Sequence, residues 1–189
     1  GFDHFTGFLS GGNRPMDPTL EVGGQNVKMK GPLPDLLVDD AIDFIRDSRD
    51  RPFALCLHFR APHRPFGPVP KVDSEPYKNL DPDVPIPPGG VAKIIKRWNR
   101  DYYASISSVD RNIGRLLDEL DRLKLTENTL VVFTSDHGDM DGSHRLASKN
   151  VFYENSVGVP FMMQYKGVIP TGVVDNKSLI SNGLDVLPP

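Results

Sequence analysis

The sequence predicts an α/β fold with a mostly parallel sheet flanked by helices, and three observations support this prediction. Short apolar runs typical of buried strands lie at residues 52–59, 130–133 and 159–165. Two longer segments, residues 34–47 and 98–123, have apolar residues at helical spacing and alternate with these runs. Polar clusters follow the first two runs, which is where open α/β sheets bind their ligands.

The composition limits the classes of protein to consider. A chain of 189 residues with 38% hydrophobic and 25% charged residues is long enough for one globular α/β domain. Its net charge of -3 argues against nucleic acid or an anionic membrane as the main partner. No apolar run reaches the roughly 18 residues of a transmembrane helix. The single cysteine, Cys56, excludes an internal disulfide.

The elements follow in order from local patterns. Residues 1–31 are rich in glycine and predict irregular chain with one short hairpin around Gly23 and Gly24. The first helix, residues 34–47, has one apolar stripe that is formed by Leu37, Ala41, Phe44 and Ile45. In the strand predicted at 52–59, Cys56 and His58 are interpreted as packed residues. The proline-rich connection from Pro65 to Lys96 has no helical or strand period and is expected to border a cleft.

The second helix, residues 98–123, has the strongest periodicity in the chain. Its apolar residues step by three or four, and they are Trp98, Tyr102, Ile106, Val109, Ile113, Leu116 and Leu120. The charged residues between them are predicted to face water, and they are Asp110, Arg111, Arg115, Asp118, Glu119 and Arg122. This helix is therefore interpreted as a packing element without a catalytic role.

Two polar loops are candidates for a functional site. After residues 130–133 come Asp136 and His137, and Lys149 follows twelve residues beyond His137. A carboxylate and an imidazole suit a divalent cation, and a lysine suits an oxyanion. The alternative is a plain turn with a hydrogen-bonded histidine. After residues 52–59, His63 lies between prolines and beside arginines, and a functional or a structural role fits it equally well.

Several segments together resemble the sulfatase family, within the alkaline phosphatase superfamily. They read GFDHFTGFL, PFALCLHFRAPHRPF, YYASISSVDRNIGRLLDEL, TLVVFTSDHGDM, KNVFYENSVGVPFM and SNGLDVLPP, and they cover most of the chain in the family's order. The Asp-His pair is similar to that of iduronate-2-sulfatase and choline-sulfatase-like members. The resemblance implies an alkaline phosphatase/sulfatase-like fold.

The resemblance also implies roles for particular residues. Asp136 and His137 match two ligands of the divalent cation, which is usually calcium, although an imidazole ligand keeps magnesium and manganese open. Lys149 matches a lysine that contacts the sulfate group. His63 matches a histidine that contacts sulfate and assists the departing oxygen. His144 lies near the family's substrate-facing loop.

The sequence departs from the family at the nucleophile. Sulfatases use a formylglycine made within a C-x-P-x-R motif, whereas the only cysteine here begins the run Cys56-Leu57-His58-Phe59-Arg60. Histidine in place of proline makes this a chance match, so we expect the formylglycine of the parent protein outside this chain. Residues 1–189 are then expected to form one partial domain, without the nucleophile region and the C-terminal subdomain, and to be inactive alone.

The expected function is therefore that of a sulfuric ester hydrolase acting on a sulfated small molecule or saccharide. A phosphomonoester or phosphonate monoester hydrolase of the same superfamily is one alternative, because the same groups serve either oxyanion. A non-catalytic metal- or sulfate-binding module is another. The compartment stays open, and family resemblance suggests only a periplasmic, secreted or lysosomal setting.

Overall fold

The computed structural model describes residues 1–10, 12–146 and 148–175, and the chain forms two compact units. The first unit comprises Gly1–Pro82 and Lys93–Leu123, and the second comprises Asp83–Ala92 and Lys124–Pro189. Within the described ranges, no helix has both the length and the apolar character needed to cross a bilayer.

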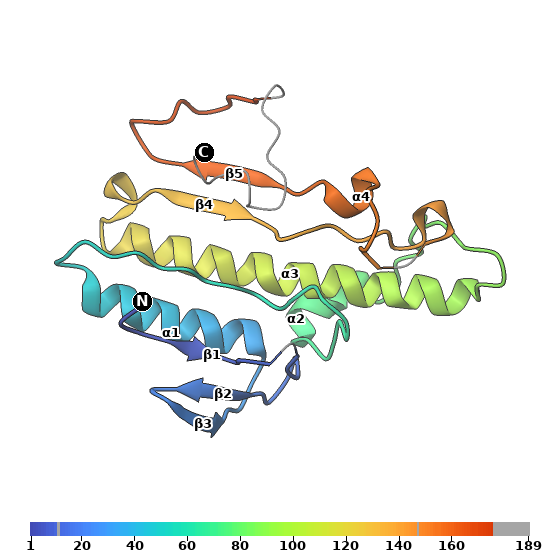
Figure 1. Cartoon of the computed structure of the whole chain (residues 1–189), viewed down its shortest axis with the longest axis horizontal. Helices are drawn as coiled ribbons and strands as arrows, with labels where there is room; N and C mark the ends of the chain where they lie inside the picture. The colour runs from blue at the N-terminus through green and yellow to red at the C-terminus, as the bar shows by residue number, and fades with distance from the viewer. Residues whose placement is uncertain (11, 147, 176–189) are drawn as a thin grey trace. The chain divides into compact units, whose positions relative to one another are not determined.

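The first unit begins with a small antiparallel sheet in the order β1-β2-β3 (Figure 1). Its strands are β1 (Thr6–Gly7), β2 (Thr19–Val22) and β3 (Gln25–Lys28). Gly23 and Gly24 connect β2 to β3 with φ angles of 57° and 80°. Two consecutive left-handed residues are what a tight hairpin turn requires, and glycine adopts them without steric cost. The predicted hairpin is confirmed.

Helix α1 (Leu33–Ser48) confirms the first predicted helix to within one residue at each end. Its buried face includes Leu33, Leu37, Val38, Ala41, Ile42 and Ile45. Leu20 of β2 is fully buried in one cluster with Leu33 and Leu37, and this cluster holds the sheet against the helix. Burial of a leucine side chain contributes about 1.5–3 kcal/mol, so these contacts are the main apolar attachment of the sheet.

Helix α3 (Ala92–Arg122) confirms the second predicted helix and starts six residues earlier. The prediction that its charged residues all face water is wrong for Arg111 and Glu119. Arg111 donates to Asp35 of α1, and the buried Glu119 accepts hydrogen bonds from Arg46 of α1 and from Arg122.

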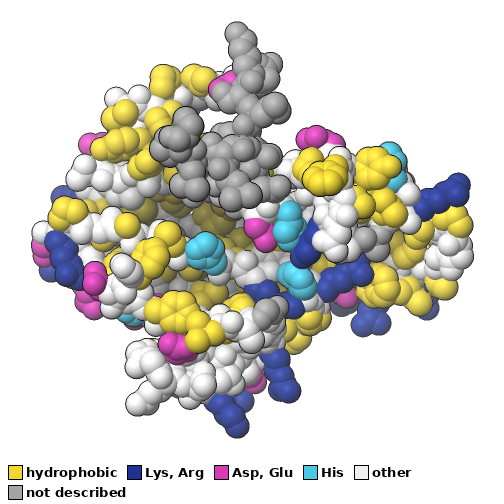
Figure 2. Space-filling view, viewed as in Figure 1, with side chains coloured by type: hydrophobic (Ala, Val, Ile, Leu, Met, Phe, Trp, Pro, Cys, Tyr) yellow, Lys and Arg dark blue, Asp and Glu magenta, His cyan; other side chains and the backbone are white. Residues whose placement is uncertain are grey.

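The face of α3 that is buried carries small polar residues, which are Ser105, Ser108 and Asn112. Small side chains let two helix backbones approach, and charged groups across such an interface are tolerated when they are paired. Part of the predicted apolar stripe instead stays at the surface, with Trp98 and Ile106 exposed by 46% and 40%. Figure 2 shows that apolar side chains are common on the visible surface.

The strand predicted at residues 52–59 is not formed. The segment has no strand assignment, and Cys56 and His58, which were expected to pack, are exposed. A strand exists only when a neighbour pairs with its backbone, and apolar residues alone do not supply one.

The proline-rich connection was predicted to lack regular structure. It contains the short helices α2 (Lys71–Ser74) and η1 (Glu75–Tyr77), and α3 already begins at Ala92. Asp73, buried in α2, bonds to Arg111 of α3. That ion pair fixes a turn of helix in a sequence without helical periodicity.

The second unit contains η2 (Thr126–Asn128), β4 (Val131–Thr134), η3 (Ser143–Arg145), α4 (Glu154–Val157) and β5 (Phe161–Gln164). The strands β4 and β5 match the predicted runs but pair antiparallel, with Val131 opposite Gln164. The strand or helix predicted within residues 172–187 falls largely outside the described residues.

The predicted parallel sheet is not confirmed, because every strand pair among the described residues is antiparallel. The sequence of an apolar strand does not distinguish parallel from antiparallel pairing. It indicates that the strand is buried, but not in which direction its partner runs. The first strand of the expected parallel arrangement, residues 52–59, has no pairing in this structure.

Candidate functional site

The polar loop of the second unit starts directly after β4, where the strand ends at Thr134. The His137 Nε2 atom lies 3.2 Å from Asp136 Oδ2, and the Asp136 side chain is largely exposed. His137 Nδ1 lies 2.7 Å from the carbonyl oxygen of Gly138. A nitrogen at that distance from a carbonyl oxygen carries the proton and donates it, which leaves Nε2 of the neutral ring with a lone pair.

This pair fits a divalent cation. Metal-bound histidines usually donate their other ring N–H to a carbonyl or carboxylate, as His137 does to Gly138. Two ligands at right angles, each about 2.1–2.6 Å from one ion, lie about 3.0–3.7 Å apart. The observed separation of 3.2 Å falls within that range. Among the described residues, no group of three or more His, Cys, Asp or Glu side chains is placed to hold a metal, so the pair offers two ligands of a larger set.

Gly138 and Ser156 fix the position of this loop. The Gly138 N–H donates to the carbonyl oxygen of Ser156 in α4 at 2.8 Å. A Cβ atom at position 138 would lie 2.1 Å from the carbonyl oxygen of Asn155, so only glycine permits this approach. The hydroxyl of Ser156, a buried residue, donates to the carbonyl oxygen of Lys149. Ser156 therefore holds both the Asp136-His137 end of the loop and Lys149.

Lys149 is half-buried, and within the described ranges its ammonium group has no hydrogen-bond or ion-pair partner. A cation without a fixed counter-ion is available to a bound anion. The structure thus links the Lys149 backbone to the same short helix that holds Gly138.

His144 is exposed and stacks on Tyr153, with ring centroids 4.3 Å apart and an interplanar angle of 10°. Its backbone is left-handed, with φ 53° and ψ 21°, and Arg145 also has a positive φ of 63°. Such conformations cost on the order of 1–3 kcal/mol each in residues other than glycine. Backbone of this kind clusters at functional sites, which supports a role for His144.

His63 belongs to the first unit and is exposed. Its Nδ1 lies 2.6 Å from the carbonyl oxygen of Arg64, and Arg60 donates through Nη1 to the carbonyl oxygen of His63 at 3.2 Å. The carbonyl oxygen of Arg64 is the nearer partner of Nδ1 and accepts its proton, although Arg60 Nη2 also lies 3.2 Å from Nδ1; Nε2 is on the opposite side of the ring. Burial lowers the pKa of Arg60, which remains charged at neutral pH.

The structure brings four of the five predicted site residues, Asp136, His137, His144 and Lys149, into one loop of the second unit and places His63 in the first. Sequence analysis missed the residues that hold them. Ser156 and Tyr153 carry no motif of their own, and their signal is only their position after the loop. The sequence shows arginines beside His63, but the hydrogen bonds of Arg60 around His63 depend on how the loop folds.

Comparison with known proteins defines the class of protein. The sulfatase family model matches residues 1–188. The chain is 32% identical over its full length to an ulvan-active sulfatase of Formosa agariphila, and 36% identical over 72% of its length to an arylsulfatase of Clostridium perfringens. It spans 38% and 32% of those two proteins.

Solved structures agree with this result. A Bacteroides fragilis protein assigned as a sulfatase, yidJ, has a TM-score of 0.78 and 31% identity, over 87% of this chain and 38% of that one. Ps i-CgsB in complex with k-i-k-neocarrahexaose has a TM-score of 0.75 at 24% identity, over 90% of this chain and 41% of its own. The second likeness shows the fold alone. The chain belongs to the sulfatase family.

Proposed function

We propose that the protein carrying this chain hydrolyses sulfate monoesters, and that this chain supplies part of its metal and sulfate site. The observation that carries the proposal is the Asp136-His137 pair, whose Oδ2 and Nε2 atoms lie at the separation of two ligands of one ion. Membership of the sulfatase family supports sulfate over phosphate as the oxyanion. Neither alternative, a phosphomonoester or phosphonate monoester hydrolase or a non-catalytic module, has an observation in its favour.

The proposed cation is calcium, with magnesium and manganese as alternatives. Asp136 would bind it through a carboxylate oxygen and His137 through Nε2, while the His137 Nδ1–H bond to Gly138 holds the ring in place. Such a cation, when bound, polarises the sulfuryl oxygens and stabilises their developing charge. Because this chain offers two ligands, the remaining ligands are proposed to come from other parts of the protein.

The remaining proposed roles follow from charge and proton position. Lys149 binds the sulfate group electrostatically through its ammonium, which has no partner among the described residues. His63, protonated on both ring nitrogens, donates the Nε2 proton to the departing alcohol oxygen and is left as the neutral ring whose Nδ1–H bonds to the carbonyl oxygen of Arg64. His144 contacts the substrate from the strained loop. The nucleophile is a formylglycine outside this chain, and residues 1–189 are a partial domain of the parent, whose central sheet is mostly parallel.

The proposed substrate is a sulfated small molecule or saccharide. Support comes from relatives: one is named for its activity on ulvan, and BT4656 was solved with its substrate D-glucosamine-2-N,6-O-disulfate, at 22% identity to this chain. The formal charge of -3 gives no broad basic surface, so nucleic acid is not proposed as a partner.

The test compares turnover of an aryl sulfate and an aryl phosphate by the full-length protein, with and without calcium. We expect faster turnover of the sulfate, loss of turnover after chelation, and a calcium-dependent rise in unfolding temperature. Asp136→Asn should abolish both calcium effects.

Asp139→Asn is the matched control, because this exposed aspartate of the same loop caps its own backbone at Asp141. It should retain both calcium effects. A faster phosphatase reaction would overturn the sulfate assignment. Unchanged calcium binding in Asp136→Asn would overturn the proposed metal site.

A further inference from the structure

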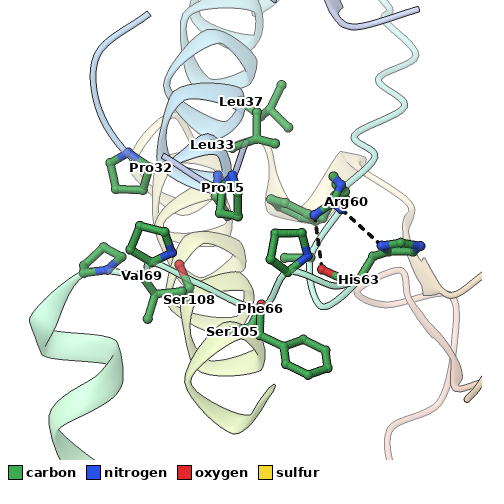
Figure 3. Close-up of a pocket in the computed structure, with 16 residues that line it drawn as sticks. Pro15, Pro32, Leu33, Leu37, Arg60, His63, Phe66, Val69, Ser105 and Ser108 are labelled. Atoms are coloured by element: carbon green, nitrogen blue, oxygen red, sulfur yellow. Dashed lines mark hydrogen bonds between the residues drawn. The ribbon is translucent and has the colours of Figure 1, made fainter. Parts of the chain in front are cut away.

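The first unit contains a small pocket behind the loop that carries His63 (Figure 3). Six of its sixteen lining residues are prolines, which offer no backbone N–H groups. The labelled side chains in Figure 3 show that α3 contributes Ser105 and Ser108, while the loop contributes Arg60 and Phe66. These prolines reduce the number of backbone donors around the pocket, so the polar side chains that line it become important for binding a polar ligand.

Two such groups have unsatisfied hydrogen-bonding capacity. Ser108 has 0% exposure, and its Oγ has no hydrogen-bond partner. The Arg60 Nε atom is also buried without a partner, although the same guanidinium donates elsewhere through its terminal nitrogens. Within the described ranges these are the two buried side-chain polar atoms without a partner, and both residues line this one pocket.

An unpaired buried donor costs about 1–3 kcal/mol, so two of them beside one cavity indicate a missing acceptor. The pocket has about 20 Å³ of space for the centre of a water-sized sphere. One water needs at least about 10–15 Å³ measured in this way. The room is enough for one water molecule and too small for a sugar or sulfate group.

We propose that this pocket holds ordered water that accepts a hydrogen bond from Arg60 Nε–H and bonds to Ser108 Oγ. The hydrated pocket would satisfy both groups and fix the plane of the Arg60 guanidinium. The two terminal nitrogens of that guanidinium bond to the carbonyl oxygens of His63 and Arg64. Arg60 is then a positioning residue for His63, and Ser108 acts on Arg60 through the water. This positioning role rests on the proposed function of His63.

The direct test measures magnetisation transfer between water and the Nε–H protons of arginine side chains by NMR, in the full-length protein labelled on arginine. We expect a cross-peak from long-lived water at Arg60 Nε–H. The matched control is Arg111, whose Nε donates to Asp73 at 2.8 Å and should show none. Absence of the cross-peak at Arg60, or an equal one at Arg111, would overturn the hydrated pocket.

Ser108→Ala and Ser108→Val test the link to His63. Alanine removes the hydroxyl, and valine also fills space that the water needs; either should weaken the Arg60 cross-peak, and valine should abolish it. In the proposed mechanism, Ser108→Val should also move the His63 ring ¹⁵N shifts and lower kcat several-fold with KM little changed. Unchanged His63 shifts would overturn the positioning role. If Ser108→Val changes the His63 shifts but the unmodified full-length protein has no sulfatase activity, the positioning role stands and only the proposed function is contradicted.

Discussion

Ser156 shows how a residue without chemistry of its own controls a candidate site. Its carbonyl oxygen accepts the Gly138 N–H, and its hydroxyl donates to the Lys149 carbonyl, with 2% of the side chain exposed. We expect Ser156→Ala to lower the free energy of unfolding by about 1 kcal/mol, because the partly buried Lys149 carbonyl loses its donor. Turnover in the full-length protein should fall as Lys149 loses its anchor.

Urea unfolding and steady-state kinetics measure the two effects. Asn155→Ala is the control, since Asn155 is an exposed neighbour in α4 and offers only its backbone to the Gly138 contact. A Ser156→Ala protein that is as stable and as active as the parent would show that this hydroxyl does not fix the loop.

Glu119 is a second residue whose environment determines its behaviour. Hydrogen bonds from Arg122, and then from Arg46, lower the pKa of Glu119 from 4.5 to about 2. A carboxyl group whose pKa is lower in the folded state stabilises the fold above its unfolded pKa and loses that effect as the pH falls. The stabilisation is thus complete above about pH 4.5 and disappears toward pH 2.

Glu119→Gln should therefore flatten the pH dependence of the unfolding free energy between pH 4.5 and 2, as measured by urea titration at each pH. Asp118→Asn is the matched control, because it is the exposed preceding residue of α3. Equal slopes for the parent and Glu119→Gln would mean that the ion pairs with Arg46 and Arg122 do not form in solution.

At the scale of elements, α2 depends on one arginine. Arg111 of α3 donates to Asp73 in α2 at 2.8 and 2.9 Å, and to Asp35 in α1 at 2.9 Å. Burial alone raises the pKa of Asp35, but hydrogen bonds from Arg111 and Asn112 outweigh it and leave that pKa below its ordinary value. The network joins three helices through one guanidinium group.

Asp73→Asn should lower the free energy of unfolding by about 2 kcal/mol, because Arg111 loses one of its two charged partners at a buried position. Amide hydrogen exchange should also accelerate in residues 71–77 ahead of α1. Asp81→Asn removes a largely exposed pair with Lys96 and should change stability little. Equal effects of the two changes would show that α2 is held by other contacts.

Helices were more predictable than strands for a physical reason. A helix satisfies its backbone within its own segment, so the periodicity of α1 and α3 was sufficient to locate them. A strand needs a partner, and residues 52–59 have the composition of a strand without one. The polar contacts of Arg111 and Glu119 were not predictable, because charges at helical spacing look alike whether they face water or a second helix.

At the scale of the whole molecule, the roles given to the candidate site residues stay a prediction, whereas the framework around them can be compared with the structure. The apolar run forms β4, and Asp136, His137 and Lys149 follow it in the loop after that strand. The left-handed turns near His144 and the Ser156 bonds arise from contacts between segments, and no local pattern encodes them. The antiparallel pairing of β4 with β5 could not be predicted for the same reason.

One face of the two-stranded sheet is apolar and open to solvent, and this gives the last prediction. Val132 of β4 lies opposite Met163 of β5, and they are exposed by 48% and 50%; Leu130, at 53%, precedes them. Contiguous apolar surface of this kind binds partners or aggregates. On the proposal that residues 1–189 are a partial domain, we expect other parts of the full-length protein to cover this face.

The 189-residue chain produced alone should therefore bind a hydrophobic dye and self-associate, as measured by fluorescence and light scattering. Val132→Thr with Met163→Thr should reduce both signals, because threonine keeps the strand preference while removing apolar surface. Val174→Thr changes an exposed valine outside any strand and serves as the control. If the control lowers dye binding as much as the double variant, the exposed face of β4 and β5 is not the source, and apolar groups elsewhere on the chain are responsible.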